Sequence, residues 1–323
     1  MRAIVPTPEG PALQDVSPPS PGAEDVLVRV YAGALNRADL FMLKGAPHGR
    51  VGGAGTPLGL EWAGEIVEVG GSVKDWRVGD KVMAANGGAF AEYAVGHMRR
   101  LYRVPEALSL KQAATLPVAL QTMHDAISTN GQLKAGQSVL IQGASSGVGL
   151  MGLQVAKYLG AGLVIGSSTN SERRALLPEF GAALAIDTKD PSWIAQVLEA
   201  TGGKGVDLLI DHVAGPLMNG NLKATRIGGR IVNVGRLGGN QGEMDFDLHA
   251  LRRISYIGVT FRTRSAAEVE KINTLTTRDL IPALADGKLR LPIDNVYPLE
   301  DFAQAFARMK RNEHFGKIVL AIA

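Results

Sequence analysis

A glycine-rich turn between a predicted strand and a predicted helix is the first feature of this sequence with chemical meaning. The run Ser138–Gln142 is short and apolar, as a buried parallel strand requires, and Gly143–Gly149 has the sequence GASSGVG. Apolar residues then recur at helical spacing as far as Leu159. Free backbone N–H groups and the positive end of a helix dipole point at such a turn, and glycine lets a diphosphate approach closely. The strand, turn and helix therefore predict a dinucleotide site.

The tip of the next predicted strand, Leu163–Gly166, indicates which dinucleotide binds. In sites that use NAD, an acidic residue at this tip bonds the ribose 2′-hydroxyl. Here the strand is followed by SSTNSERR, which supplies two serines (Ser167, Ser168) and two arginines (Arg173, Arg174). Hydroxyls and a guanidinium suit a 2′-phosphate, which a carboxylate would repel. We predict NADPH as the cofactor, the alternative being that the arginines only begin a solvated helix.

Strands and helices alternate in the middle of the chain, after Pro117. The predicted strands are Ser138–Gln142, Leu163–Gly166, Leu184–Ile186, Val206–Ile210, Arg230–Val234 and Ser255–Val259. A helix over Val118–Asn130 precedes them, and further helices begin near Gly147, Ser171, Pro191, Pro216 and Asp247. This α/β pattern predicts a doubly wound parallel sheet, the Rossmann fold.

The first 117 residues predict a second, mostly β domain. Its strands are expected at Ala3–Val5, Val26–Ala34, Gly64–Val69, Asp80–Ala84 and Ala91–Val95, with a short helix in Asn36–Leu43 that leaves Asp39 exposed and a loop at His48–Thr56. The helical stretches Ala266–Asp286 and Leu299–Lys310 and the strand Lys317–Ala321 do not extend the nucleotide fold. We therefore expect a discontinuous domain of residues 1–117 and 262–323, and a nucleotide domain of residues 118–261.

Composition excludes several kinds of site. The chain has 323 residues and a net charge of +3, and its basic residues form scattered pairs, so we expect no nucleic-acid partner. It has no cysteine, which excludes disulfides, thiolate nucleophiles and cysteine-ligated metals. No run of about 18 apolar residues and no basic-then-apolar signal occur, so we expect a cytoplasmic protein with no membrane partner.

Several blocks in fixed order resemble the zinc-free quinone oxidoreductase branch of the medium-chain dehydrogenases/reductases. They are ALNRADLFMLKG (34–45), PLGLEWAGEIVEVG (57–70), VGDKVMA (78–84), the glycine turn, GVDLLIDHVAG (205–215), GGRIVNVG (228–235) and HFGKIVL (314–320). FRTRS (261–265) is also similar to the sub-branch of the p53-inducible quinone reductase. The resemblance implies a GroES-like catalytic domain beside the Rossmann domain, and a homodimer joined through the sheet edge near Ser255–Val259.

The resemblance also implies site residues. Those expected to cradle the diphosphate are Ala144, Ser145, Ser146, Gly147 and Val148, and those expected at the 2′-phosphate are Ser168 and Arg173. His212 and Val213 are expected at the adenosine end, Val234, Gly235 and Arg236 near the nicotinamide, and Phe261 and Lys317 on the approach from the closing segments. The expected catalytic residues are Asn36 and Thr122, which would flank the nicotinamide and substrate, and Arg262 as a further hydrogen-bond donor.

Differences from zinc-bearing relatives predict a site without metal. Those relatives have a catalytic cysteine where this chain has Asn36 and a histidine where it has Leu60, and the six histidines here are dispersed. The chain also has Phe41 where some quinone reductases have a tyrosine, and Thr188 where many relatives have one near the 2′-phosphate. Asp39 and Glu61 are expected to be structural, Asp39 through a bond to nearby backbone.

These features predict an NADPH-dependent reductase of quinones or α,β-unsaturated carbonyls. Hydride transfer to such an acceptor needs no metal, and a donor near the acceptor oxygen, such as Asn36, would stabilise the charge that develops there. Two alternatives remain. One is reduction of 2-enoyl thioesters, with a basic rim from residues 48–50 and 262–264. The other is an NADPH-binding protein of low turnover that binds RNA.

Overall fold

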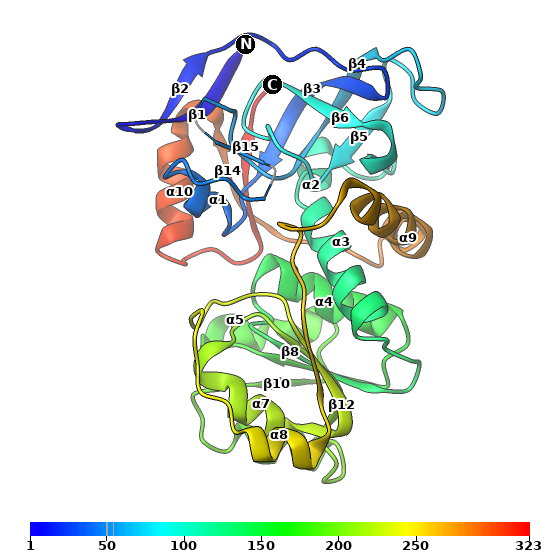
Figure 1. The fold of residues 1–323 in the computed structure, drawn as a ribbon, viewed down its shortest axis with the longest axis vertical. Coiled ribbons are helices and arrows are strands. Elements are labelled where there is room, and N and C mark those ends of the chain that lie inside the picture. The colour runs from blue at the N-terminus through cyan, green and yellow to red at the C-terminus, as the bar shows by residue number, and fades with distance from the viewer. Residues whose placement is uncertain (50, 54) are drawn as a thin grey trace. The chain divides into compact units, whose positions relative to one another are not determined.

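The computed structural model describes residues 1–49, 51–53 and 55–323 of the chain, and these form two units (Figure 1). Unit 1 consists of Met1–Val118, Phe261–Ala285 and Arg290–Ala323. Unit 2 consists of Ala119–Thr260 with the short segment Asp286–Leu289. Each unit has its own sheet and its own core, and each is described separately below.

Unit 2 is built on a six-stranded sheet in the order β10-β9-β8-β11-β12-β13, in which every neighbouring pair is parallel. The strands are β8 (Ser138–Gln142), β9 (Leu163–Ser167), β10 (Leu184–Ile186), β11 (Val206–Asp211), β12 (Thr225–Asn233) and β13 (Ser255–Gly258). Numbered along the chain this is the order 3-2-1-4-5-6 of a Rossmann fold, which confirms the predicted fold class. The order reverses between β8 and β11, so a ligand is expected at the carboxyl ends of these two strands.

Helices cover both faces of this sheet (Figure 1). They are α3 (Pro117–His124), η2 (Asp125–Asn130), α4 (Gly147–Tyr158), α5 (Ser171–Ala175), η3 (Leu177–Phe180), α6 (Trp193–Ala200), η4 (Gly215–Leu217), α7 (Met218–Ala224) and α8 (Phe246–Arg252). The core on one face joins Leu140 and Leu209 of the sheet to Trp193 and Leu222 of α6 and α7. The single helix predicted over Val118–Asn130 is partly wrong, because its second half, η2, has the wider π-helical winding.

Unit 1 contains a seven-stranded sheet in the order β14-β15-β3-β4-β5-β7, with β6 paired to β3, and a separate hairpin of β1 and β2. Its strands are β1 (Arg2–Thr7), β2 (Gly10–Asp15), β3 (Asp25–Ala34), β4 (Trp62–Val69), β5 (Lys81–Ala84), β6 (Tyr93–His97), β7 (Tyr102–Arg103), β14 (Ile293–Pro298) and β15 (Lys317–Ala321). The last strand, β15, pairs antiparallel with β3, so the C-terminal strand joins the N-terminal sheet. β2, β7 and β14 were not predicted, because their short, polar or proline-containing sequences give little alternation.

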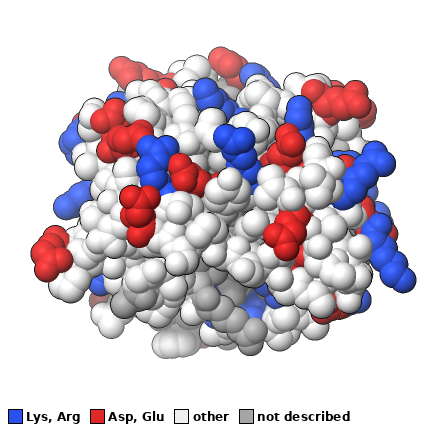
Figure 2. All heavy atoms as spheres, turned by 90° about the horizontal axis from the view of Figure 1, so that it is seen from above, with Lys and Arg blue, Asp and Glu red and all other residues white. Residues whose placement is uncertain are grey.

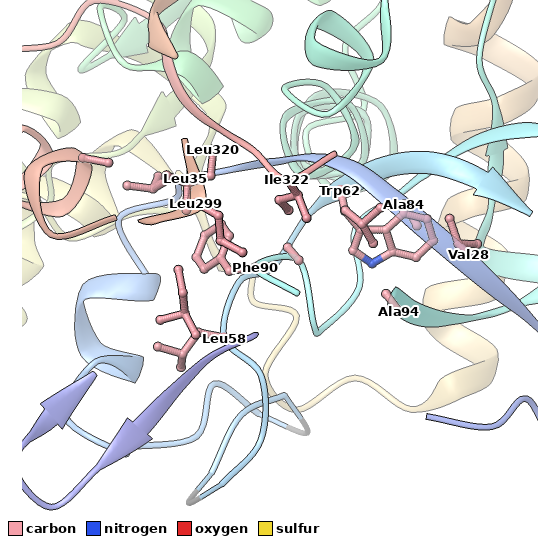
Figure 3. Packing of buried hydrophobic residues seen from close by; sticks show 14 of the residues in the cluster. Val28, Leu35, Leu58, Trp62, Ala84, Phe90, Ala94, Leu299, Leu320 and Ile322 are labelled. Carbon is pink, nitrogen blue, oxygen red and sulfur yellow. The ribbon is translucent and has the colours of Figure 1, made fainter. Parts of the chain in front are cut away.

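The helices of unit 1 are α1 (Asp39–Met42), η1 (Met98–Arg100), α2 (Leu110–Ala113), α9 (Ala266–Ala285), η5 (Leu299–Asp301) and α10 (Phe302–Lys310). Its core lies between the sheet and α10 (Figure 3). The rings of Phe90 and Phe306 pack edge to face in this core with their centroids 5.8 Å apart, and the fully buried Trp62 belongs to the same core. In the described part of the chain no helix has the length and apolar character that a membrane crossing requires.

Candidate functional site

The glycine-rich turn joins β8 to α4 and places two glycines where another residue would not fit well. Gly143 has a φ of +69°, in the left-handed region. A Cβ on Gly149 would lie 2.6 Å from the carbonyl oxygen of Gly143, so α4 can begin this close to β8 only with glycine there. Ser146 caps the helix, since its hydroxyl accepts the N–H of Gly149 at 3.1 Å. The N-terminus of α4 therefore adjoins the end of β8.

Not every N–H group of this turn is able to bind an anion. Ala144 donates its N–H to the carbonyl of Ser167 at 2.8 Å, which fixes the turn against β9. Among the described residues, no acceptor contacts the N–H of Ser145 or that of Val148, which lies in the first turn of α4. First-turn N–H groups have no acceptor within their own helix and carry the positive end of its dipole. These two predicted cradle residues therefore offer donors to an anion, and Ala144 holds the turn.

The end of β9 lies beside the glycine turn. The hydroxyl of Ser168, predicted at the 2′-phosphate, bonds the hydroxyl of Ser145 at 3.0 Å. Arg174 donates to the Ser168 carbonyl at 2.8 Å and pairs with Asp187 at 2.9 Å. Arg173 is half-buried and, like Arg174, lies in the last turn of α5, where the helix dipole favours cations. Because α5 has only five residues, Ser171–Ala175, both arginines also belong to its first turn, and the contact of Arg173 with the 2′-phosphate stays a prediction.

The turns after β11 and β12 meet the glycine turn on its other side. A Cβ on Gly143 would lie 3.4 Å from the side chains of His212 and Val213. A Cβ on Gly235 would lie 2.8 Å from the carbonyl oxygen of His212, so the turns after β11 and β12 are in contact. Burial lowers the pKa of His212 to about 4, which keeps this histidine neutral at physiological pH. Predicted cofactor residues from three turns thus gather where the strand order reverses, with Val234 half-buried and Arg236 exposed in the turn after β12.

Unit 1 contains a buried polar cluster, defined here as Asn36, Asp39, Glu61 and Lys317. The ammonium of Lys317 pairs with the carboxylate of Glu61 and donates to Asn36 Oδ1 at 2.9 Å. Glu61 also accepts from Asn36 Nδ2 and from the N–H of Val118, each at 2.9 Å. Lys317 and Glu61 are 4% and 0% exposed. Removal of one partner would strand a buried charge, which costs about 3–5 kcal/mol in comparable pairs.

Asp39 is buried, and the prediction that it is exposed is wrong. One of its carboxylate oxygens accepts the N–H of Asn36 at 2.6 Å, which confirms the predicted bond to nearby backbone. The other oxygen is buried without a hydrogen-bond partner among the described residues. Burial raises the pKa of Asp39 to about 7; Glu61 reinforces the rise, and the N–H of Asn36 and the charge of Lys317 oppose it. A helix of only four residues, Asp39–Met42, does not reveal in its sequence which side chain faces inward, and that is the reason for the error.

The remaining predicted catalytic and closing residues lie in both units. Asn36 is 8% exposed, and its amide donates to Glu61 and, at 3.4 Å, to the carbonyl of Ala34. Phe261 and Arg262 belong to unit 1; Phe261 is covered by the guanidinium of Arg264 at 5.8 Å, and Arg262 is exposed. Thr122 is half-buried on α3 in unit 2. The predicted rim of residues 48–50 includes Arg50, which lies outside the described residues.

Metal ligands do not gather in the described residues, where no group of three or more histidine, cysteine, aspartate or glutamate side chains is placed to hold an ion. Position 36 is asparagine and position 60 is leucine. The side chain of Asn36 accepts a hydrogen bond from the ammonium of Lys317, which pairs with Glu61.

Comparison with known proteins agrees with this architecture. Residues 22–106 match the alcohol dehydrogenase GroES-like domain family, and residues 147–277 match the zinc-binding dehydrogenase family. A quinone oxidoreductase of Rattus norvegicus is 30% identical over 311 residues, which cover 95% of this chain and 92% of that protein. The chain belongs to the quinone oxidoreductase branch of the medium-chain dehydrogenase/reductase superfamily. It is therefore related to oxidoreductases along nearly its whole length.

Two further similar proteins differ in how much of their own length matches this chain. The solved quinone oxidoreductase of Pseudomonas syringae pv. tomato DC3000 is 28% identical, with a TM-score of 0.87, and the match covers 99% of each chain. A mycocerosic acid synthase-like polyketide synthase of Mycobacterium tuberculosis is 29% identical over 313 residues. That match covers 96% of this chain but only 15% of the much longer synthase.

Two parts of the candidate site were not predicted. Glu61 was expected to be structural, but its pairing with Lys317, 256 positions away, was not foreseen. Asp211 and Asn221 were not singled out, although both are buried where the predicted cofactor turns meet. A polar residue at the end of an apolar strand run, as in LLIDH (208–212), is a signal that could have drawn attention to Asp211.

The buried carboxylate of Asp39 predicts a pH dependence of stability. From pH about 4, the ordinary Asp value, to about 7, the folded protein keeps a proton that the unfolded chain releases. The free energy of unfolding contributed by Asp39 is therefore present at low pH and is lost as pH rises through this window. In Asp39→Asn the amide oxygen can still accept from Asn36 but does not titrate, so this variant should gain stability relative to wild type as pH rises.

Urea unfolding at about pH 5 and about pH 8, followed by tryptophan fluorescence, measures this difference. The exposed Asp15→Asn serves as the control and should keep the wild-type profile. Parallel profiles for Asp39→Asn and wild type would contradict the assignment.

Proposed function

We propose that this protein is an NADPH-dependent, zinc-independent reductase that transfers hydride to a quinone or an α,β-unsaturated carbonyl. The observation that carries the proposal is the pair of free N–H groups, on Ser145 and Val148, at the α4 N-terminus beside the reversal of strand order. A diphosphate placed there would accept from both groups and from the positive end of the dipole. The chain belongs to a branch that contains quinone oxidoreductases, and this supports a quinone as the acceptor.

The residues present fit NADPH at the adenosine end. No carboxylate stands at the tip of β9, and the hydroxyl of Ser168 is 3.0 Å from that of Ser145 in the cradle. Arg173 lies in α5, five residues after Ser168, and its side chain is half-buried, so we assign it as the cation for the 2′-phosphate. The neutral, buried ring of His212 would border the adenosine without adding charge.

When bound, the nicotinamide supplies a hydride to an electron-poor carbon of the acceptor. The protein then has to stabilise the charge that develops on the acceptor oxygen. We assign Asn36 as a donor to this oxygen, because its 3.4 Å contact with Ala34 is at the long limit of a hydrogen bond and leaves one amide N–H easily redirected. The bonds of Asn36 to Lys317 and Glu61 would hold its amide in place.

The two alternatives have less support. RNA binding needs a basic surface, but on the face in Figure 2 acidic and basic side chains are interspersed and no large basic patch forms. Reduction of 2-enoyl thioesters is favoured by the likeness to a polyketide synthase and by the exposed Arg262, which could meet an acyl-carrier phosphate. It uses the same cofactor and the same hydride step, so the choice of acceptor in an assay separates it from quinone reduction.

The test is oxidation of NADPH and NADH by the purified protein with ortho- and para-quinones, simple enones and a 2-enoyl thioester, all with EDTA present. We expect NADPH-selective turnover that the chelator does not reduce. Turnover confined to the thioester would favour the alternative acceptor. Tight NADPH binding without turnover on any acceptor would contradict an enzymatic role.

Arg173→Ala tests the cofactor assignment. A hydrogen bond to a charged group contributes about 1.5–3 kcal/mol, so the variant should bind NADPH about 10- to 100-fold more weakly and NADH almost unchanged. Lys204→Ala removes an exposed charge elsewhere in unit 2 and is the matched control. Isothermal titration calorimetry measures both affinities, and equal losses for NADPH and NADH would place Arg173 away from the 2′-phosphate.

We further propose that the protein forms a homodimer through the edge strand β13. In the described sheet β13 pairs only with β12, which leaves one strand edge open, and Tyr256 of β13 is 42% exposed. The helix that precedes this strand, α8, carries two more exposed apolar side chains, Phe246 at 76% and Leu251 at 66%. Analytical ultracentrifugation should show a species of twice the chain mass. Tyr256→Asp should shift it toward monomer, and Ile227→Asp, at another exposed apolar residue of unit 2, should not. A wild-type protein of single-chain mass would refute the dimer.

A further inference from the structure

Four buried polar residues join the ends of three neighbouring strands in unit 2. Gln142 ends β8, Ser167 ends β9 and Asp211 ends β11, while Asn221 lies on α7. Their exposed fractions are 0%, 2%, 0% and 0%. We call them the carboxyl-edge network, and it lies across the point where the strand order reverses.

The hydrogen bonds of the network all run from donor to acceptor toward Asp211. Asn221 donates to the Asp211 carboxylate at 3.0 Å, and its own amide oxygen accepts from Gln142 at 2.9 Å. The amide oxygen of Gln142 accepts from the hydroxyl of Ser167, whose oxygen accepts the N–H of Gly143 at 3.0 Å. An ionised carboxylate only accepts, so Asp211 fixes which way each amide and hydroxyl points. Such a chain of hydrogen bonds in a dry interior is mutually strengthening.

The network holds the turns that carry the predicted cofactor contacts. Ser167 fixes the glycine turn by accepting N–H groups from Gly143, at its hydroxyl, and from Ala144, at its carbonyl. The carboxylate of Asp211 accepts the N–H groups of Val213 and Ala214, both at 2.8 Å. Its carbonyl accepts from Val234 at 2.8 Å and from Gly235 at 3.1 Å. One connected set of bonds therefore positions all three turns.

Backbone strain at Ala214 indicates that this positioning has a purpose beyond filling the core. Ala214 has φ 57° and ψ −149°, a region that essentially only glycine adopts. Its N–H is held by Asp211 at 2.8 Å. Strain of this kind persists where the surroundings determine it, and it is concentrated at ligand clamps. If these buried polar residues served only the fold, well-packed apolar side chains could replace them, and the backbone at Ala214 would not need to be strained.

We propose that the carboxyl-edge network is a positioning network that sets the affinity for the dinucleotide through the three turns. The inference rests on the proposed function, since it requires that these turns bind a nicotinamide dinucleotide. Because the glycine turn contacts the diphosphate, which NADPH and NADH share, loss of the network weakens both cofactors equally. This distinguishes its effect from that of Arg173, which acts on the 2′-phosphate alone.

Asn221→Leu interrupts the network in the middle, and Ser167→Ala removes the acceptor of the Gly143 N–H with a smaller change in volume. The matched control is Thr225→Val, which deletes another fully buried side-chain hydrogen bond of unit 2, from the Thr225 hydroxyl to the Asn221 carbonyl at 2.8 Å. Dissociation constants for NADPH and NADH are measured by calorimetry on the full chain, well below the unfolding temperature of each variant.

We expect both network variants to raise the two dissociation constants about tenfold and by the same factor, and Thr225→Val to change them less than about twofold. If Asn221→Leu does not fold, Ser167→Ala decides alone. Wild-type affinity in a folded network variant, or a loss confined to one cofactor, would overturn the inference. Failure of the wild-type protein to bind either cofactor would instead overturn the proposed function.

Discussion

The carboxylate of Asp211 accepts three hydrogen bonds in a position closed to solvent, and the nucleotide edge of unit 2 depends on that arrangement. Burial raises the pKa of this group, and the N–H groups of Ala214 and Val213, the amide of Asn221 and the charge of Arg236 oppose the rise. A charge this deep persists only where donors surround it. The donors come from a turn and a helix, so satisfying the charge also fixes where the backbone runs after β11. From there the same bonds extend to β8 and β9.

Unit 1 also buries charged groups, and there an ion pair balances the charge. Lys317 and Glu61 neutralise each other in its interior, and Asn36 bonds to both. Buried ion pairs contribute little net stability against an apolar replacement, but they strongly disfavour arrangements in which one partner is missing. Lys317 lies in β15, near the end of the chain, and Glu61 directly precedes β4. The ion pair therefore favours the arrangement in which the C-terminal strand joins the first sheet beside β3.

Periodicity and glycine placement carried most of the sequence prediction. The apolar runs at 138–142 and 184–186 coincide with β8 and β10, because strands of a parallel sheet that is covered by helices are rich in apolar residues. The GASSGVG turn was located correctly because close packing of α4 on β8 requires Gly149. Asp39 was misplaced and the partner of Glu61 was not foreseen, because side-chain direction in a four-residue helix and contacts across 256 positions leave no local pattern. For the same reason the sequence did not reveal that Ala144 donates its N–H within the protein, whereas the N–H of Ser145 meets no acceptor among the described residues.

We propose that the three turns at the carboxyl edge of unit 2 hold an NADP-type dinucleotide by its diphosphate and its 2′-phosphate. Phosphorus-31 NMR of NADPH titrated into the intact protein tests this most directly, because it observes both groups at once. We expect the diphosphate resonances to shift on binding, and the 2′-phosphate, with an ordinary pKa of about 6, to stay dianionic to lower pH beside a guanidinium. Unshifted diphosphate resonances at saturating protein, or a 2′-phosphate that titrates as it does in free NADPH, would contradict the claim.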